Sequence, residues 1–112
     1  MSPSAIQRIH IVLAHVPKGC VVSYGQLADL AGLPGRARLA GTALKNLPVK
    51  STLPWHRVLR SNGQLVFPIN SDAFLRQQKL LAQEGVAVKN GRVDLKQHQW
   101  RPALSDLLAL EF

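Results

Sequence analysis

The N-terminal segment carries the pattern of an amphipathic helix. Residues 5–16 place an apolar side chain every three or four positions, which is the spacing of one helix face. Ser4 and Gln7 have the spacing of a capping box, in which the side chain of each residue bonds to the backbone N–H of the other. Residues 17–19, Pro-Lys-Gly, interrupt the pattern. The sequence therefore predicts a helix from about residue 5 to Val16.

Two further helices are predicted, joined by a tight turn. Ser23 and Gln26 repeat the capping-box spacing and begin a helix that ends at Gly32. A third helix is expected from about 36 to 46. Its predicted buried stripe consists of Ala37, Ala40, Leu44 and Leu47. Two short helices joined by a turn that contains glycine are typical of a helix-turn-helix.

The third helix also carries side chains suited to a charged partner. Its N-terminal end and its expected exposed face hold Arg36, Arg38, Thr42 and Lys45. Between them lie the small residues Ala40, Gly41 and Ala43. Small residues allow a partner to approach closely, and arginines with free helix N-terminal amides suit phosphate.

The second half of the chain predicts short strands around one more amphipathic helix. Residues 58–59 and 65–66 are apolar and flank a turn, so a first hairpin is expected there. A second hairpin is expected over 86–95, with a type I′ turn at Asn90 and Gly91.

Between these two predicted hairpins, Ser71 is expected to cap a helix that ends near Gly85. The residues predicted to face inward on it are Phe74, Leu75, Leu81 and Ala82. A last helix is possible after Pro102. The expected fold is one domain over residues 1–112, mostly α with small β hairpins and a helix-turn-helix of winged-helix type.

Charge and composition narrow the class of partner. The chain has 14 Lys and Arg against 6 Asp and Glu, a net charge of +8 and a pI near 10.6. A small domain this basic usually meets a polyanion, and nucleic acid is the first candidate; an ordinary protein kept soluble by its charge is the alternative. No run of 18 apolar residues and no signal-peptide pattern occurs. The single Cys20 excludes an internal disulfide and cannot form a zinc site alone. We therefore expect a cytoplasmic protein, nucleoid-associated if bacterial, with no metal or other cofactor and no membrane partner.

The segment Pro54-Trp55-His56-Arg57-Val58 carries the most specific signal. It resembles the active-site segment of the O6-alkylguanine-DNA alkyltransferases, which reads Pro-Cys-His-Arg-Val. In that family the cysteine takes an alkyl group from damaged guanine and is not regenerated. Here Trp55 stands in its place, and indole has no nucleophile that could replace a thiolate. The chain is similar to the alkyltransferase-like proteins, which bind alkylated DNA without repairing it. On local pattern alone, a short strand with Trp55 as packing explains the segment equally well.

Further segments extend this resemblance to the C-terminal domain of the alkyltransferases over about residues 5 to 95. Residues 21–28 resemble the entry into the family's helix-turn-helix, where a tyrosine crowds the phosphate of the target nucleotide and promotes its rotation; Tyr24 matches it. Arg38 occupies the position of the arginine finger, which enters through the minor groove and fills the vacated space. Without the resemblance, a phosphate-contacting or solvated arginine would be the preferred interpretation of Arg38.

Other matches concern the support of the active-site segment. Asn46 matches the asparagine that braces the preceding turn, and Ser71 matches the serine of the pocket loop. Residues 80–85 resemble the segment whose glutamate orients the active-site histidine, which implies a Glu84–His56 pair. Without a thiol to activate, this pair is expected to remain as a structural hydrogen bond.

The resemblance assigns the candidate site residues to four groups. The expected lesion pocket consists of Tyr24, Pro54, Trp55, Val58 and Ser71. The DNA-intercalating finger is Arg38. Contacts to the DNA backbone are expected from Arg36, Lys45, Arg60 and Ser61. The structural remnant of the active site consists of Asn46, His56 and Glu84.

The loop of residues 66–70 departs from the related enzymes. It is expected to be longer, and it lacks their pocket tyrosine and glycine pair, which leaves room for bulkier adducts. Trp55 would offer the alkyl group a large apolar surface, or it would overfill the pocket. We favour the first reading because Pro54 and Val58 are kept.

The expected function is recognition of O6-alkylguanine in duplex DNA by nucleotide flipping, without alkyl transfer. The resemblance implies that the bound protein, a monomer, marks the lesion for nucleotide excision repair through damage-recognition proteins. One alternative is a residual enzyme, an alkyltransferase using Cys20 or a hydrolase using His56 and Glu84; the missing nucleophile argues against it. The other is a transcription regulator that reads sequence, against which the small residues of the third helix argue.

Overall fold

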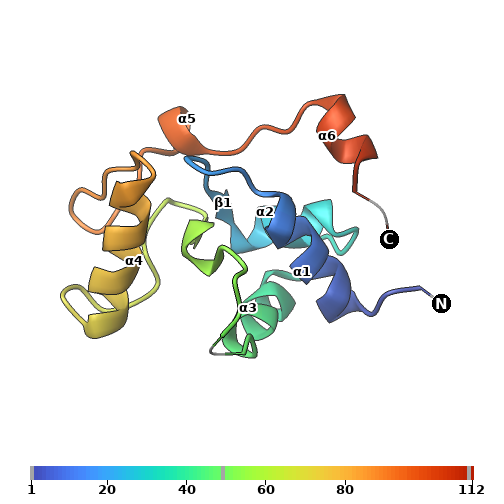
Figure 1. The fold of residues 1–112 in the computed structure, drawn as a ribbon, viewed down its shortest axis with the longest axis horizontal. Helices are drawn as coiled ribbons and strands as arrows, with labels where there is room; N and C mark the ends of the chain where they lie inside the picture. The colour runs from blue at the N-terminus through green and yellow to red at the C-terminus, as the bar shows by residue number, and fades with distance from the viewer. Residues whose placement is uncertain (1, 49, 111) are drawn as a thin grey trace.

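The computed structural model describes residues 2–48, 50–110 and 112, and it is mostly helical (Figure 1). Its elements in chain order are α1 (Ala5–His15), β1 (Val22–Ser23), α2 (Tyr24–Leu30), α3 (Ala37–Lys45), the 3₁₀ helix η1 (Trp55–Arg57), β2 (Val58–Leu59), α4 (Asp72–Gln83), α5 (Leu95–His98) and α6 (Leu104–Leu108). The predicted fold class, mostly α with little β structure, is confirmed. Among the described residues, no helix is long and apolar enough to cross a membrane.

The first helix forms as its capping signal predicts. The Ser4 hydroxyl accepts from the Gln7 N–H, and the Gln7 side chain accepts from the Ser4 N–H at 2.7 Å. Ile9, Val12 and Leu13 form the buried face of α1.

At α2 the predicted capping box forms only in one direction. The Ser23 hydroxyl accepts from the Gln26 N–H at 3.0 Å, as expected. The Gln26 side chain instead donates to the Trp100 carbonyl at 2.7 Å and accepts from Gln99. The C-terminal segment crosses the start of α2, so a distant contact replaces the local one.

The buried face of α3 differs from the predicted stripe. Ala40 and Ala43 are fully buried, whereas Ala37 is exposed. The small residues let α1 approach closely, since His10 Nε2 lies 3.0 Å from the Ala43 carbonyl oxygen. Ala40 is therefore buried, as the predicted stripe implied, and Ala43, which was not part of that stripe, is buried beside it.

The two strands form a parallel pair, which corrects the first predicted hairpin. Val22 pairs with Val58 and Ser23 with Leu59. Residues 64–65 pair instead with the turn at 91–92, where the Leu65 N–H donates to the Gly91 carbonyl at 2.9 Å. Val58 and Leu59 are both buried, so their strand needs a buried neighbour, and β1 supplies it.

The second predicted hairpin is confirmed at its turn. Lys89 and Arg92 exchange two backbone hydrogen bonds, at 2.8 and 3.0 Å. Asn90 and Gly91 have φ angles of 53° and 75°. Two successive residues with positive φ are what a type I′ turn requires.

The helix α4 is capped by Ser71 as predicted, but its inward face is different. The Ser71 hydroxyl accepts from the Phe74 N–H at 3.2 Å. The buried residues are Phe74, Gln77 and Leu81. Leu75 and Ala82, which were expected to face inward, are exposed. Because the buried row includes the polar Gln77, the apolar residues alone did not show which face of the helix is buried.

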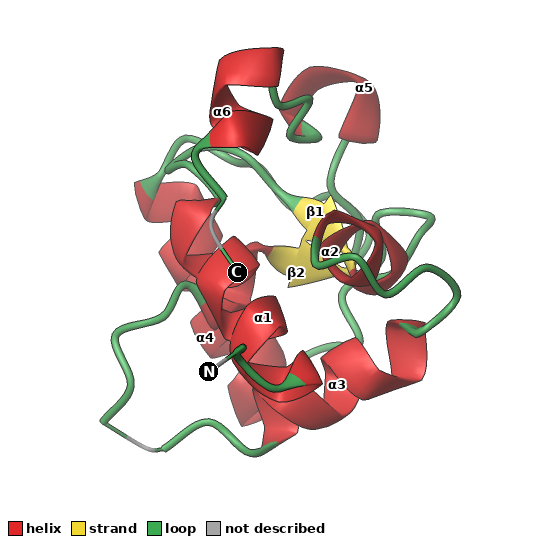
Figure 2. Ribbon diagram, turned by 90° about the vertical axis from the view of Figure 1, so that its right-hand side faces the viewer, coloured by secondary structure: helices red, strands yellow, loops and turns green. Residues whose placement is uncertain are grey.

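The β pair lies between two apolar clusters. Val22 and Val58 belong to the cluster built on α1, α2 and α3, and Leu59 belongs to the cluster that α4 covers. Adjacent residues of a strand point to opposite faces, so two short strands join both halves of the protein. Figure 2 shows the pair beside α2, with α3 below it and α6 at the opposite end.

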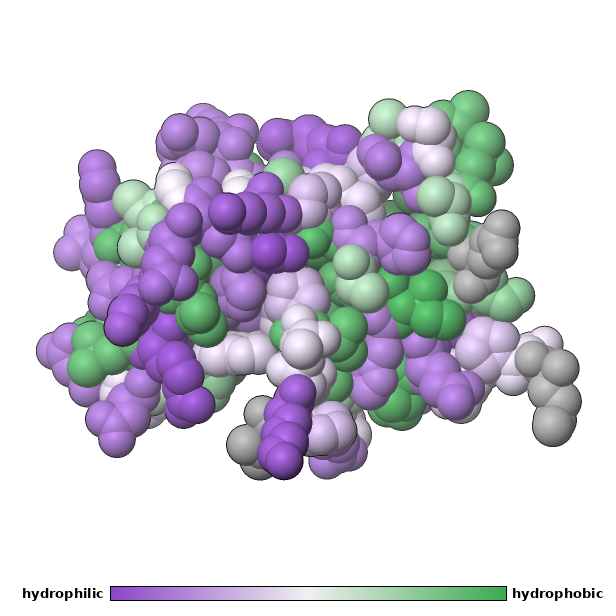
Figure 3. Space-filling model, in the orientation of Figure 1, coloured by the Kyte–Doolittle hydropathy of each residue, from purple (hydrophilic) through white to green (hydrophobic). Residues whose placement is uncertain are grey.

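The C-terminal segment contains the expected helix after Pro102, α6, and an additional short helix, α5. Leu104, Leu107 and Leu108 of α6 are exposed. In Figure 3 most of the visible surface is hydrophilic, and an apolar area lies at the upper right, where Figure 1 places α6.

Candidate nucleic-acid interface

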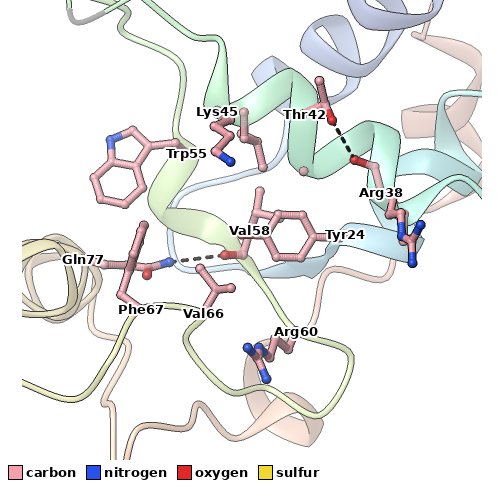
Figure 4. A pocket seen from close by; sticks show the side chains of 13 residues that line it. Tyr24, Arg38, Thr42, Lys45, Trp55, Val58, Arg60, Val66, Phe67 and Gln77 are labelled. Carbon is pink, nitrogen blue, oxygen red and sulfur yellow. Dashed lines mark hydrogen bonds between the residues drawn. The ribbon is translucent and has the colours of Figure 1, made fainter. Parts of the chain in front are cut away.

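A cavity of about 640 Å³ opens between α2, α3, η1 and the chain that follows β2 (Figure 4). This volume lies within the range of sites that bind small organic groups. The lining residues are Tyr24, Ala37, Arg38, Gly41, Thr42, Leu44, Lys45, Trp55, Val58, Arg60, Val66, Phe67 and Gln77.

Aromatic rings form one wall of the cavity. The rings of Trp55 and Phe67 meet edge to face, with centroids 6.2 Å apart and planes at 82°. Trp55 also meets the ring of His56 edge to face at 6.1 Å. Val58 and Val66 add aliphatic surface to the lining. This wall can pack against an apolar group or a base.

Three cations belong to the lining. Lys45 ends α3, Arg38 lies in its first turn, and Arg60 directly follows β2. All three are exposed. The cavity therefore combines an apolar wall with a positive rim, an arrangement that suits a base attached to a phosphate backbone.

Tyr24, the first residue of α2, lines the same cavity. Burial raises the pKa of its phenol, and the positive charge of Arg60 only partly opposes this effect. The phenol is therefore neutral at physiological pH and able both to donate and to accept a hydrogen bond.

Behind the aromatic wall, Glu84 holds η1 in place. Its carboxylate lies 2.8 Å from His56 Nε2, the contact that the resemblance implied. It also accepts from the Arg57 guanidinium at 2.7 and 2.9 Å and from the Gly19 N–H at 3.1 Å. Arg57 donates in addition to the Val16 carbonyl at 2.7 Å. One carboxylate thus connects η1, the end of α4 and the turn after α1.

Charge and hydrogen bonding both act on this carboxylate. Burial alone would raise the pKa of Glu84, but the bonds from Arg57, His56 and Gly19 outweigh burial and lower it to about 2. Glu84 is therefore ionised at neutral pH. Arg57 was not assigned a role from the sequence, although it stands in the matched segment beside His56.

The structure brings together only part of the expected lesion pocket. Tyr24, Trp55 and Val58 line the cavity, and Pro54 and Ser71 are outside its lining. Pro54 precedes η1 and its carbonyl accepts from the Arg57 N–H at 3.1 Å. The Ser71 hydroxyl is occupied by the cap of α4.

The expected backbone-contacting residues also divide into two groups. Lys45 and Arg60 line the cavity, while Arg36, the N-cap of α3, and Ser61 are exposed outside it. Asn46 is the C-cap that follows α3, and the residue is exposed.

Several lining residues were missed by sequence reasoning, among them Phe67 and Gln77. The spacing of Gln77 from Phe74, three residues along α4, was the signal available for it. Cys20, proposed as an alternative nucleophile, is outside the lining and packs partly buried against the first apolar cluster.

Comparison with known proteins places the chain among DNA-binding relatives. The family model of the 6-O-methylguanine DNA methyltransferase DNA-binding domain matches residues 4–86. The DNA base-flipping protein of Escherichia coli (strain K12) is 42% identical over 95 residues, which cover 84% of this chain and 72% of that protein. Alkyltransferase-like protein 1 of Schizosaccharomyces pombe is 31% identical over 100 residues, covering 85% and 93%.

Solved structures agree with these matches. The crystal structure of S. pombe Atl1 in complex with damaged DNA containing O6-carboxymethylguanine superposes with a TM-score of 0.80, at 30% identity, over 88% of this chain and 95% of that one. Mycobacterium tuberculosis OGT in complex with DNA gives a TM-score of 0.65 at 33% identity, over 76% and 51%. The chain therefore belongs to the family of the 6-O-methylguanine DNA methyltransferase DNA-binding domain and, within it, is an alkyltransferase-like protein.

Proposed function

We propose that this protein recognises O6-alkylguanine in duplex DNA by rotating the damaged nucleotide out of the base stack into the cavity, and that it does so without transferring the alkyl group. The observation that carries the proposal is the position of Trp55 in the cavity wall. The resemblance of residues 54–58 to the active-site segment of the alkyltransferases implies that Trp55 stands where those enzymes have their cysteine. The names of the relatives, a base-flipping protein and an Atl1 bound to damaged DNA, support the same reading.

Each part of the cavity has a role in this proposal. The rings of Trp55 and Phe67 pack against the alkyl group. Tyr24, which lines the same cavity, crowds the phosphate of the target nucleotide, the role that the resemblance implies for it. Arg38 enters the duplex and fills the space that the base leaves. Lys45 and Arg60 bind phosphates at the rim. Rotating a base out of the stack costs a few kcal/mol, less for a poorly paired lesion, so these contacts have a modest cost to offset.

Among the described residues, the lining of the cavity contains no thiol that could accept the alkyl carbon. Transfer requires a nucleophile that bonds to this carbon while the bond from the carbon to O6 breaks, and the guanine that leaves must take up a proton on N1. Burial keeps Tyr24 neutral, and the Thr42 hydroxyl donates to the Arg38 carbonyl at 3.2 Å. His56 is engaged by Glu84. Binding therefore ends with the lesion intact.

An intact lesion must be removed by another system. We propose that the bound complex marks the damage for nucleotide excision repair and that damage-recognition proteins of that pathway are its partners. The protein would act as a monomer inside the cell, where such duplex DNA is found.

The deciding experiment compares affinity for two duplexes of one sequence, one carrying O6-methylguanine and the other guanine. We expect tighter binding to the lesion, together with unchanged masses of protein and DNA after prolonged incubation. Equal affinities would overturn lesion recognition. A protein that gains one methyl group, at Cys20 or elsewhere, would overturn the absence of transfer.

A further inference from the structure

Gln77 is a polar residue in a buried position. Only 1% of its surface is exposed, and it lies in the core-facing row of α4 with Phe74 and Leu81. Its side-chain Nε2 donates to the carbonyl oxygens of His56 at 3.0 Å and Val58 at 3.2 Å. Because both partners are acceptors, they fix the orientation of the amide, with its nitrogen toward η1 and β2 and its oxygen directed away from them.

The amide oxygen of Gln77 has no such partner. Oε1 is buried and accepts no hydrogen bond from any residue in the described part of the chain. Buried acceptors are normally paired, because an unpaired one has lost its water without compensation. Gln77 also lines the cavity, and Figure 4 shows it at the end where Trp55 and Phe67 lie. An acceptor in need of a donor is therefore placed at the aromatic end of the proposed lesion site.

The chemistry of the lesion identifies the matching donor. Alkylation at O6 removes the hydrogen that guanine carries on N1, so N1, N3 and N7 are all acceptors. The exocyclic 2-amino group then holds the only N–H bonds of the base. An acceptor that contacts the base edge through a hydrogen bond must therefore meet the 2-amino group.

We propose that Gln77 is a specificity-determining residue whose Oε1 accepts a hydrogen bond from the 2-amino group of the flipped O6-alkylguanine. This inference rests on the proposed function and adds a second recognised feature of the damaged base, the 2-amino group, to the alkyl group. Oε1 is covered in the free protein, so the base reaches it when a wall ring turns aside. Phe67 is the ring placed to move, since it is only partly buried and belongs to an irregular loop. The aromatic wall then selects the alkyl group, and Gln77 selects a purine with an amino group at C2.

The test removes the donor from the base and the acceptor from the protein. Equilibrium affinities are measured for duplexes of one sequence carrying O6-methylguanine, or O6-methylhypoxanthine, which lacks only the 2-amino group. The wild type is compared with Gln77→Met, which has a similar length and no acceptor, and with Gln77→Glu, which keeps an acceptor oxygen. Gln83→Met makes the same change on the exposed part of α4 and serves as the matched control.

The readout is the ratio of the two affinities in each variant. Losing the 2-amino group also weakens the base pair in the duplex, but this affects every variant equally and cancels between them. We expect the preference for O6-methylguanine to fall about tenfold in Gln77→Met, the cost of leaving one buried polar group unpaired. It should be kept in Gln77→Glu and Gln83→Met. A purely structural role would weaken binding to both duplexes and leave their ratio unchanged, as circular dichroism and thermal unfolding of each variant would help to establish.

Two different results would overturn two different statements. If the wild type binds O6-methylguanine and guanine duplexes equally, the proposed function itself fails. If it prefers the lesion but the 2-amino preference is absent, or is the same in Gln77→Met, lesion recognition stands and the role of Gln77 is refuted.

Discussion

Replacing Glu84 with glutamine should destabilise the fold by about 3 kcal/mol at neutral pH. The folded protein lowers the pKa of this carboxyl group from 4.5 to about 2, and each pKa unit corresponds to about 1.4 kcal/mol of differential stabilisation. The carboxylate side chain is 9% exposed, so solvent screens these interactions only weakly. The substitution also leaves the Arg57 guanidinium, 16% exposed, without its anionic partner.

The pH dependence of the effect has a definite sign. Because the pKa of Glu84 is lower in the folded than in the unfolded state, its contribution is fully present above about pH 4.5 and is lost as the pH falls toward about 2. The stability difference between the wild type and Glu84→Gln should therefore persist down to about pH 5 and shrink steadily below that. The pKa of Glu84 is lowered because the hydrogen bonds from Arg57, His56 and Gly19 outweigh the effect of burial, which would raise it.

Urea unfolding curves, followed by circular dichroism at a series of pH values, measure this difference. Asp29→Asn is the matched control, since Asp29 is an exposed carboxylate on α2; we expect it to change stability little at any pH. A loss below about 0.5 kcal/mol in Glu84→Gln at pH 7 would refute the reasoning. So would a difference that stays constant down to pH 3.

Three further predictions concern DNA. Arg38→Ala should weaken binding to an O6-methylguanine duplex about tenfold, more than it weakens binding to undamaged DNA. The control Arg76→Ala, on the exposed face of α4, should reduce both affinities slightly and equally. A signal from a fluorescent base analogue beside the lesion that is unchanged in Arg38→Ala would show that Arg38 does not support flipping. Trp55→Cys places a thiol beside His56, which bonds to Glu84. We expect it to transfer a methyl group slowly at best, because the resemblance implies that the loop of residues 66–70 is longer than in the enzymes. Mass spectrometry over time measures this, and repair as fast as in the active family would contradict it. With a net charge of +8, affinity for undamaged DNA should fall steeply with salt, while the ratio of damaged to undamaged affinity holds or rises up to physiological salt; a ratio that collapses toward one would mean that the cavity does not read the lesion.

The features predicted correctly from the sequence are those that a few neighbouring residues determine. The Ser4–Gln7 capping box, the Ser71 cap and the Asn90-Gly91 turn each satisfy their own backbone bonds within a few positions. The matched segment around Trp55 is equally local, and it places Trp55 and Val58 in the cavity lining.

The errors concern contacts between distant parts of the chain. Val58 looked like the first strand of a hairpin, but its partner is Val22, and a pattern of apolar residues does not identify which buried strand lies beside it. Gln26 had a local partner available and instead bonds to Trp100. Gln77 was not among the residues predicted to face inward on its helix, although its side chain is buried and donates to the carbonyls of His56 and Val58.

The Glu84 contacts give this carboxylate a structural role that does not depend on a thiol. Arg57 donates to Glu84 at 2.7 and 2.9 Å and also to the Val16 carbonyl at the end of α1, so most of this network does not involve His56. We expect removal of the carboxylate to release η1, and with it Trp55. A substitution at Trp55, by contrast, changes one side chain of the cavity wall and removes none of these hydrogen bonds. Under the proposed function, Trp55→Cys therefore tests the chemistry of the cavity, and Glu84→Gln tests the support of its wall.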